Sequence, residues 1–176
     1  LNQVRQVMPA LDEASVGWLE EPFSPHDARL YREARSMGRT PLAAGENHYT
    51  RFEFLRLLED GAVTVIQPDL SKTGGITECL RIAAMMSVWK LKINPHTSLT
   101  GRNVAACRHY LCSIDDAGYF EADLSAFNPL RDQLCDWQAK ADSNGTVMPP
   151  DGPGLGVNID EAMLKEFPLI DGPGYV

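Results

Sequence analysis

The sequence repeats one pattern five times: a short apolar run ends in a side chain that can bind a metal ion or move a proton. The residues that end these runs are Glu20, Glu46, Asp69, His96 and Glu121. Successive members lie 26, 23, 27 and 25 residues apart, and the gaps contain apolar residues at helical spacing. Because short apolar strands that alternate with amphipathic helices are typical of parallel βαβ units, the pattern predicts a parallel sheet packed against helices.

The expected strands decide which parallel fold is favoured. They cover residues 16–19, 41–44, 63–66, 91–94 and 118–120. A doubly wound open sheet gathers its functional side chains at one switch point, whereas a (β/α) barrel carries them after several consecutive strands. All five runs end in such a side chain, and no Gly-x-Gly-x-x-Gly follows a strand, so the sequence favours a barrel.

A complete barrel needs more strands than this chain offers. Eight strands and about 250 residues are usual, whereas the chain has 176 residues. Val4, Met8 and Leu11 already show helical spacing, so we expect the sequence to open inside an element. We therefore expect the later part of a barrel over residues 1–145. The remainder would come from residues or a chain outside this sequence, since half a barrel leaves two open sheet edges.

Local signals predict where some elements begin. Ser24 is expected to cap the helix that follows the first strand, because a proline comes directly after it. Later in the chain the periodicity weakens. Residues 127–138 are expected to be helical, residues 146–148 to form a short strand, and Asp160 to cap a last helix.

Charge and composition exclude some partners. The net charge of −8 argues against nucleic acid or an anionic membrane surface, since both need clustered Lys and Arg. No apolar run approaches the ~20 residues that a membrane span needs, and no signal peptide is visible. The four cysteines form no Cys-x-x-Cys pair, which indicates buried thiols in a reducing compartment, and we expect a cytoplasmic protein. An anionic substrate stays compatible with this charge where a divalent cation is bound.

The five strand-end residues suit one kind of chemistry. Glu20 and Glu46 end adjacent strands, and an all-oxygen site of this kind suits Mg²⁺ or Mn²⁺. A third ligand is expected one βα unit earlier, upstream of residue 1. Asp69 and His96 end the next two strands, and an Asp beside a His makes the imidazole a general base. Glu121 could bond a substrate oxygen. The set suits removal of a proton next to a carboxylate, with a cation stabilising the enediolate that results.

These residues also have structural interpretations. An acid after a strand is a common helix cap or turn residue, and His96 alone could be a hydrogen-bonded structural histidine. Five such residues at near-constant spacing favour a shared site. Glu21 should point to the other side of its strand and is interpreted as structural. Lys72 could be a general-base or Schiff-base lysine, but a salt bridge or a helix start is favoured. His48 could line the site, although a solvated loop position is slightly favoured.

Five short motifs also occur together in a fixed order. They are Trp18-Leu-Glu-Glu-Pro, Ala44-Gly-Glu-Asn, Gln67-Pro-Asp-Leu-Ser-Lys-Thr-Gly-Gly, Asn94-Pro-His and Tyr119-Phe-Glu, and the later Pro153-Gly-Leu-Gly is similar too. At these motifs the chain resembles the enolase superfamily, in its mandelate racemase/muconate lactonizing enzyme family, and most closely the mandelate racemase-like branch. The resemblance implies an α/β fold: strands four to eight of a (β/α)₇β TIM-like barrel, with the N-terminal capping domain and first strands absent. Residues 146–176 would form a C-terminal segment that returns toward the capping domain.

The resemblance also implies roles for the strand-end residues. Glu20 and Glu46 match the second and third ligands of Mg²⁺, and the first ligand, an Asp, would lie upstream of residue 1. Asp69 and His96 match the family's His–Asp pair, and Glu121 matches the acid that hydrogen-bonds the substrate carboxylate. Members with lysines on both sides of the site would carry Lys at the position of Asp69. The sequence therefore argues against muconate cycloisomerase-like and dipeptide epimerase-like members.

Three functions follow as hypotheses. The favoured one is an enzyme, a carbon–oxygen lyase that removes water from a sugar acid, as aldonate and aldarate dehydratases do. A racemase or epimerase of a 2-hydroxy acid is the alternative in the same superfamily, and it would need a second base on a strand outside this chain. A non-catalytic barrel scaffold is the alternative from another class. The expected partners are a small carboxylate substrate, the N-terminal part of the same protein and further copies in a homo-oligomer.

Overall fold

A parallel sheet of four short strands organises the computed structural model, which describes residues 1–138 and 140–172. The strands are β1 (Leu19–Glu20), β2 (Leu42–Ala44), β3 (Val65–Ile66) and β4 (Lys92–Ile93). They lie side by side in the order β1-β2-β3-β4, and every pairing is parallel. Each strand thus neighbours the next one in sequence, as the predicted βαβ repeat requires.

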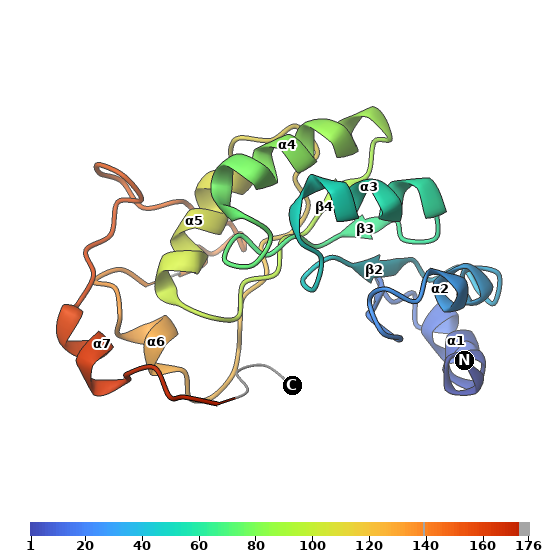
Figure 1. Ribbon diagram of the computed structural model, residues 1–176, viewed down its shortest axis with the longest axis horizontal. Coiled ribbons are helices and arrows are strands. Elements are labelled where there is room, and N and C mark those ends of the chain that lie inside the picture. The colour runs from blue at the N-terminus through green and yellow to red at the C-terminus, as the bar shows by residue number, and fades with distance from the viewer. Residues whose placement is uncertain (139, 173–176) are drawn as a thin grey trace.

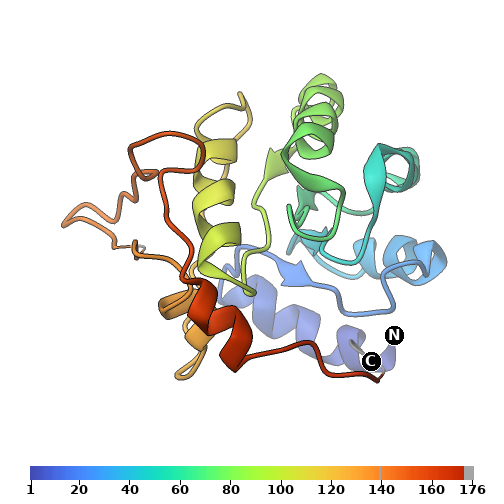
Figure 2. The same ribbon diagram turned by 60° about the vertical axis from the view of Figure 1, so that its left-hand side comes forward.

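One helix fills each crossover between the strands. These helices are α2 (Ala28–Arg35), α3 (Thr50–Asp60) and α4 (Gly75–Val88); α1 (Asn2–Glu13) precedes β1, and α5 (Gly101–Leu111) follows β4. Figure 1 shows α3, α4 and α5 along the strands, with the later segment that holds α6 (Pro129–Asp132) and α7 (Glu161–Glu166) set beyond α5. Figure 2 shows α4, α3 and α2 following one another around the strands. Across the described residues, no helix has the length and apolar character that crossing a membrane requires.

The helices bury one face of the sheet. Leu42, Ile66 and Ile93 point from the strands into the main apolar core and are at most 1% exposed. They share this core with apolar side chains of α4, among them Ile82 and Met86. Burying one such side chain contributes about 1.5–3 kcal/mol. Burial against the helices therefore accounts for the apolar residues on this face of the strands.

The opposite face of the sheet carries the polar side chains. Glu20 is in register with Ala43, and Ala43 with Val65. Residues in register on neighbouring strands point to the same face of a sheet, so Glu20 lies on the face away from the helix core. Gln67 lies on this face too, because it follows Val65 by two residues and its amide reaches Glu20. The polar side chains Glu20 and Gln67 thereby lie on the face that helices do not cover.

The fifth expected strand is not continuous. Ala117 makes a single parallel bridge with Ile93, and the Gly118 N–H donates to the Ile93 carbonyl over 2.8 Å. The next N–H, that of Tyr119, donates to the side-chain oxygen of Asn94 instead of a backbone carbonyl. The side chain replaces the backbone acceptor, so the ladder ends after one bridge.

The prediction that Ser24 caps the first crossover helix is wrong. α2 begins at Ala28, and its cap is Asp27, whose carboxylate accepts the Leu30 N–H over 3.2 Å. Asp is at least as good a cap as Ser because its side chain is also a short acceptor. The residues from 24 to 27 form a turn instead.

Two predictions for the later segment are also wrong. Residues 127–138 contain only the short helix α6, because the chain turns away to make an antiparallel bridge between Cys135 and Ile159. Residues 146–148 form no strand. Asp160 caps α7 as expected, since its carboxylate accepts a backbone N–H two residues further on, over 2.9 Å.

Candidate active site

The five side chains that the sequence singles out all follow the carboxyl ends of the strands. Glu20 is the last residue of β1, and Glu46 and Asp69 come two and three residues after β2 and β3. His96 comes three residues after β4, and Glu121 follows the bridge that extends the sheet beyond it. Carboxyl ends of parallel strands share one edge of the sheet, so these side chains gather there.

Asp69 and His96 form a buried hydrogen-bonded pair. Asp69 is fully buried, and its Oδ2 lies 2.8 Å from Nδ1 of His96. The other oxygen, Oδ1, accepts hydrogen bonds from the Ser71 N–H and hydroxyl and from the Asn103 amide, at 2.8, 2.6 and 3.1 Å. Burial raises the pKa of the Asp69 carboxyl, but the hydrogen bonds from His96 and Ser71 outweigh it and the pKa is lowered. Asp69 is therefore a carboxylate that fixes the orientation of the imidazole.

The second nitrogen of His96 faces the candidate metal ligands. Nε2 lies 3.0 Å from Glu46 Oε2 and 3.0 Å from the Ser98 hydroxyl. Burial lowers the pKa of His96, but the hydrogen bond with Asp69 and the charges of Glu46 and Glu121 outweigh it, so the pKa is raised. The imidazole can therefore hold a proton at the point where the acids meet.

Glu46 is surrounded by donors on both oxygens. Its Oε1 lies 3.3 Å from Lys72 Nζ and accepts a bond from the Asn47 amide over 3.3 Å, while Oε2 faces His96. The salt bridge agrees with the favoured interpretation of Lys72. Glu21 accepts a bond from the same Asn47 amide over 2.8 Å and so supports the loop that carries Glu46, as its structural interpretation requires.

Glu20 lies at the exposed side of the site and is held by two donors. Its Oε2 accepts hydrogen bonds from Gln67 Nε2 over 2.8 Å and from Trp18 Nε1 over 3.2 Å. Gln67 is not among the site residues predicted from the sequence. A signal was present, because this amide stands two residues before Asp69 at the end of a β-branched run.

Glu121 completes the group through its charge. Its side chain is half-buried, and burial raises the pKa of the carboxyl. The charges of Glu20 and Glu46 raise that pKa further, while His96 acts in the opposite direction, and the net shift is upward. Glu121 therefore lies within electrostatic reach of these three residues, and direct contacts join His96 to Glu46 and to Asp69.

The carboxylates fit a hard divalent cation in chemical kind. Mg²⁺ is usually bound by one or two protein carboxylates together with waters and substrate oxygens, and Glu20 and Glu46 offer two such groups from neighbouring strands. Within residues 1–138 and 140–172, no set of three His, Cys, Asp or Glu side chains is placed to hold a metal. The third protein ligand, expected upstream of residue 1, stays a prediction.

His48 neither lines the candidate site nor lies in a solvated loop position. It is only 3% exposed, so the favoured solvated position is wrong. Its ring packs against those of His26 and Phe54, at centroid distances of 5.0 and 5.8 Å, and not into the group of acids. Burial and the neighbouring His26 lower the pKa of His48 to about 4. His48 is therefore a neutral packing residue beneath its loop.

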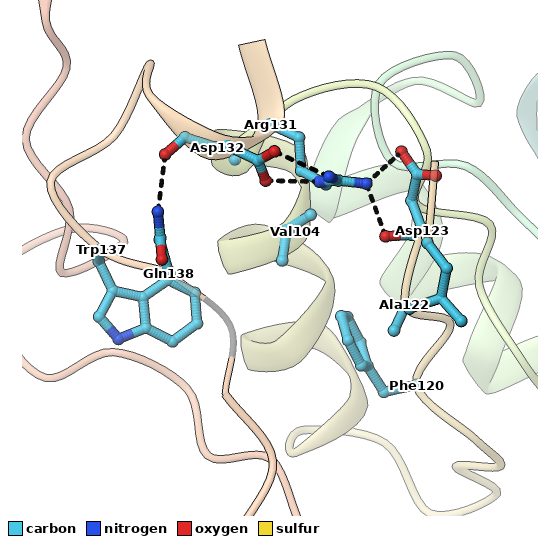
Figure 3. Close-up of a pocket in the computed structure, with 10 residues that line it drawn as sticks. Val104, Phe120, Ala122, Asp123, Arg131, Asp132, Trp137 and Gln138 are labelled. Atoms are coloured by element: carbon cyan, nitrogen blue, oxygen red, sulfur yellow. Dashed lines mark hydrogen bonds and ion pairs between the residues drawn. The ribbon is translucent and has the colours of Figure 1, made fainter. Parts of the chain in front are cut away.

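A separate cavity of about 250 Å³ lies beside α5 and α6 and contains none of the five residues. Figure 3 shows Phe120 and Trp137 on its two sides, with Arg131 paired to Asp123 and Asp132 across its rim. Both carboxylates of this cavity are engaged by Arg131 in ion pairs. The strand-end group is the better candidate.

Comparison with known proteins finds a matching family and several similar proteins. The model of the family described as "Enolase C-terminal domain-like" matches residues 1–163. D-galactonate dehydratase of Ralstonia pickettii (strain 12J) is 39% identical over 153 residues, which are 85% of this chain and 40% of that enzyme. An enolase superfamily member from Polaromonas sp. JS666 has a solved structure with a TM-score of 0.93 at 52% identity, covering 99% of this chain and 46% of that one.

A second solved structure is also similar to this chain. A mandelate racemase/muconate lactonizing enzyme-like protein from Roseovarius sp. TM1035 gives a TM-score of 0.83 at 31% identity, covering 93% of this chain and 40% of that one. The chain thus spans less than half the length of each of these three relatives.

Proposed function

This chain belongs to the Enolase C-terminal domain-like family of the enolase superfamily, and on that basis we propose that the full-length protein removes the proton next to a substrate carboxylate with the help of Mg²⁺. The observation that carries the proposal is the 2.8 Å contact between Asp69 Oδ2 and His96 Nδ1. It commits Nδ1 to the carboxylate and leaves Nε2 on the side where the acids gather. A histidine held in this way is suited to general-base catalysis.

The residues of this chain take distinct roles in the proposal. His96 accepts the α-proton at Nε2, and Asp69 stabilises the imidazolium that forms. Glu121, whose carboxyl has a raised pKa, bonds a carboxylate oxygen of the substrate. Glu20 and Glu46 would hold a divalent cation, which would supply positive charge for that carboxylate. The third cation ligand would come from the N-terminal part of the same protein.

We favour a sugar acid as substrate and loss of water as the outcome. The support is the 39% identity to D-galactonate dehydratase, an enzyme whose name specifies a sugar acid and a dehydration. After proton removal, the imidazolium of His96 can return the proton to the departing β-hydroxyl, which leaves as water. The product of that step is a 2-keto-3-deoxy acid after tautomerisation.

The test is a screen of the full-length protein with Mg²⁺ against aldonic and aldaric acids. Formation of 2-keto acid would be compared between wild type and the variant His96→Asn. We expect product from wild type with at least one acid and a loss of activity of about 10²–10⁴-fold in the variant. Thermal unfolding of both proteins would show that the variant is folded.

Other outcomes of the same screen count against the proposal in different ways. Exchange of the α-hydrogen for deuterium in wild type alone, with no 2-keto acid from any member of the panel, would replace dehydration by racemisation or epimerisation. Equal activity of wild type and His96→Asn would remove His96 from the base role. Absence of both product and exchange would favour a non-catalytic scaffold.

A further inference from the structure

Gln67 lies beneath the candidate site and reaches across the sheet to Glu20. Its side chain is 2% exposed, and its Nε2 donates to Glu20 Oε2 over 2.8 Å. β2 lies between the strands that carry these two residues, so the bond spans an intervening strand. That strand contributes Ala43 in register with Glu20, and Gly45 comes directly after the strand. These two small residues leave the path between Gln67 and Glu20 open.

Gly45 fits so closely that it also constrains Gln67. A Cβ at Gly45 would lie 2.6 Å from the backbone carbonyl carbon of Gln67. The Gln67 N–H also donates to the carbonyl of Ala44 over 3.0 Å. The backbone of Gln67 is therefore held tightly against the end of β2.

The contact with Glu20 determines the orientation of the Gln67 amide. Oε1 of Gln67 is buried and has no hydrogen-bond partner among the residues that the structure describes. Rotating the amide by half a turn would place Oε1 against the carboxylate of Glu20, where two acceptors repel. Buried acceptors without a partner are uncommon in proteins. In the observed orientation the amide therefore donates to Glu20, and its oxygen is left without a partner.

Both donors to Glu20 address the same oxygen. Trp18 Nε1 donates to Oε2 over 3.2 Å, in addition to Gln67. Because Oε2 is engaged twice, Oε1 is the oxygen that remains for a cation. We propose that Gln67 is a positioning residue that holds Oε2 of Glu20 from below and so presents Oε1 to the cation. The proposal rests on the proposed function, in which Glu20 is a cation ligand.

The test measures cation binding directly and does not depend on turnover. The probe is Mn²⁺, titrated into the metal-free full-length protein and followed by the electron paramagnetic resonance signal of the free ion. Gln67→Met keeps the length of the side chain but removes the donor. We expect its dissociation constant for Mn²⁺ to rise about 10-fold or more, because outer-shell partners of metal ligands typically contribute 10–100-fold to affinity.

Three further variants make the result specific. Thr73→Val removes a buried hydroxyl that bonds the His48 carbonyl, 3.3 Å away, and touches no candidate ligand, so it should bind Mn²⁺ as wild type does. Trp18→Phe keeps an aromatic ring but removes the longer of the two bonds, and a smaller loss of affinity is expected. Glu20→Gln should weaken binding most.

The outcomes separate this inference from the proposed function. If Glu20→Gln loses Mn²⁺ affinity while Gln67→Met binds like wild type, the positioning role is wrong and the cation site stands. If Glu20→Gln leaves affinity unchanged, the cation site itself is wrong, and the positioning role falls with it. Should Gln67→Met fail to fold, Gln67→Asn provides the same test, because its shorter side chain keeps the amide but cannot span the gap. Wild-type affinity in that variant would overturn the proposal.

Discussion

Glu46 Oε2 lies 3.0 Å from His96 Nε2, although the two residues follow strands that are not neighbours in the sheet. β3 lies between β2 and β4, so the two loops lean over its end to bring these side chains together. A candidate cation ligand and the candidate base therefore share one contact. In the proposed reaction the substrate proton is transferred to His96 beside this contact. Turnover should therefore depend on the orientation of the imidazole.

Asp69→Asn tests that orientation. The change keeps a side chain of the same size but replaces the carboxylate by an amide, which no longer stabilises an imidazolium. We expect kcat to fall about 10²–10⁴-fold with little change in KM, as for loss of general-base function. Steady-state kinetics on the acid found in the substrate screen would measure it. Asp132→Asn is the control, because that carboxylate pairs with Arg131 outside the site. Near-normal kcat in Asp69→Asn would contradict the role of the pair.

The sequence predicted the type and order of the elements better than their lengths. Strands β1, β3 and β4 each have only two residues. Pro22, Pro68 and Pro95 follow them closely, and a proline has no N–H to continue a ladder. The apolar runs thus locate the strands, while the prolines limit how far they pair. The family comparison confirms the expected fold, the later part of an enolase-type barrel.

Within the site, the sequence predicted pairs that follow neighbouring strands. Asp69 and His96 follow β3 and β4, so their contact could be expected from strand order alone. The bond from Gln67 to Glu20 could not, because it crosses β2 and depends on how small the side chains of that strand are. The burial of the His48 side chain could not be predicted either, since a histidine in a loop gives the same sequence pattern whether it is buried or exposed.

Gly45→Ala should disturb both the fold and the site. Gly45 has φ of +151°, which side chains rarely allow, and a new Cβ would come within 2.6 Å of the Gln67 backbone. Strain and overpacking together should lower the free energy of unfolding by about 2–4 kcal/mol. Urea denaturation would measure the loss. Gly17→Ala is the matched control, because a Cβ there meets no atom within 4 Å, and a change below about 1 kcal/mol is expected. Equal effects of the two changes would contradict the close approach at Gly45.

Asp123 gives the protein a pH-dependent contribution to stability. Its carboxylate accepts bonds from the Ser125 N–H at 2.9 Å and the Asn128 amide at 3.1 Å, and it pairs with Arg131 at 3.1 Å. Burial raises the pKa of Asp123, but these bonds outweigh it and lower the pKa to about 2. A depressed carboxyl pKa stabilises the fold above the unfolded value of about 3.9, and this contribution is lost as the pH falls toward the folded value.

Asp123→Asn should remove that dependence. At pH 7 we expect the variant to be about 1–2 kcal/mol less stable than wild type, since bonds to a charged group are lost. The difference should shrink as the pH is lowered from 5 toward 2, because the wild-type carboxyl then becomes protonated. Urea midpoints in a pH series would follow it, with the exposed Asp115→Asn as control. A difference that stays constant over this range would show that ionisation of Asp123 does not matter for stability.

The sequence allows two roles for Lys72, a reacting lysine and a structural cation, and variants of this residue distinguish them. Its Nζ lies 3.3 Å from Glu46 Oε1, and its side chain is 14% exposed. A positive charge at that distance repels a divalent cation held by the same carboxylate. Lys72→Met should therefore tighten Mn²⁺ binding severalfold, while Lys72→Arg, which keeps the charge, should leave it near the wild-type value. If Lys72 were instead the base or formed a Schiff base, both variants would also lose turnover by about 10²-fold or more. Steady-state kinetics beside the Mn²⁺ titration separates these cases, because Lys72→Arg keeps its turnover only if Lys72 is a structural cation.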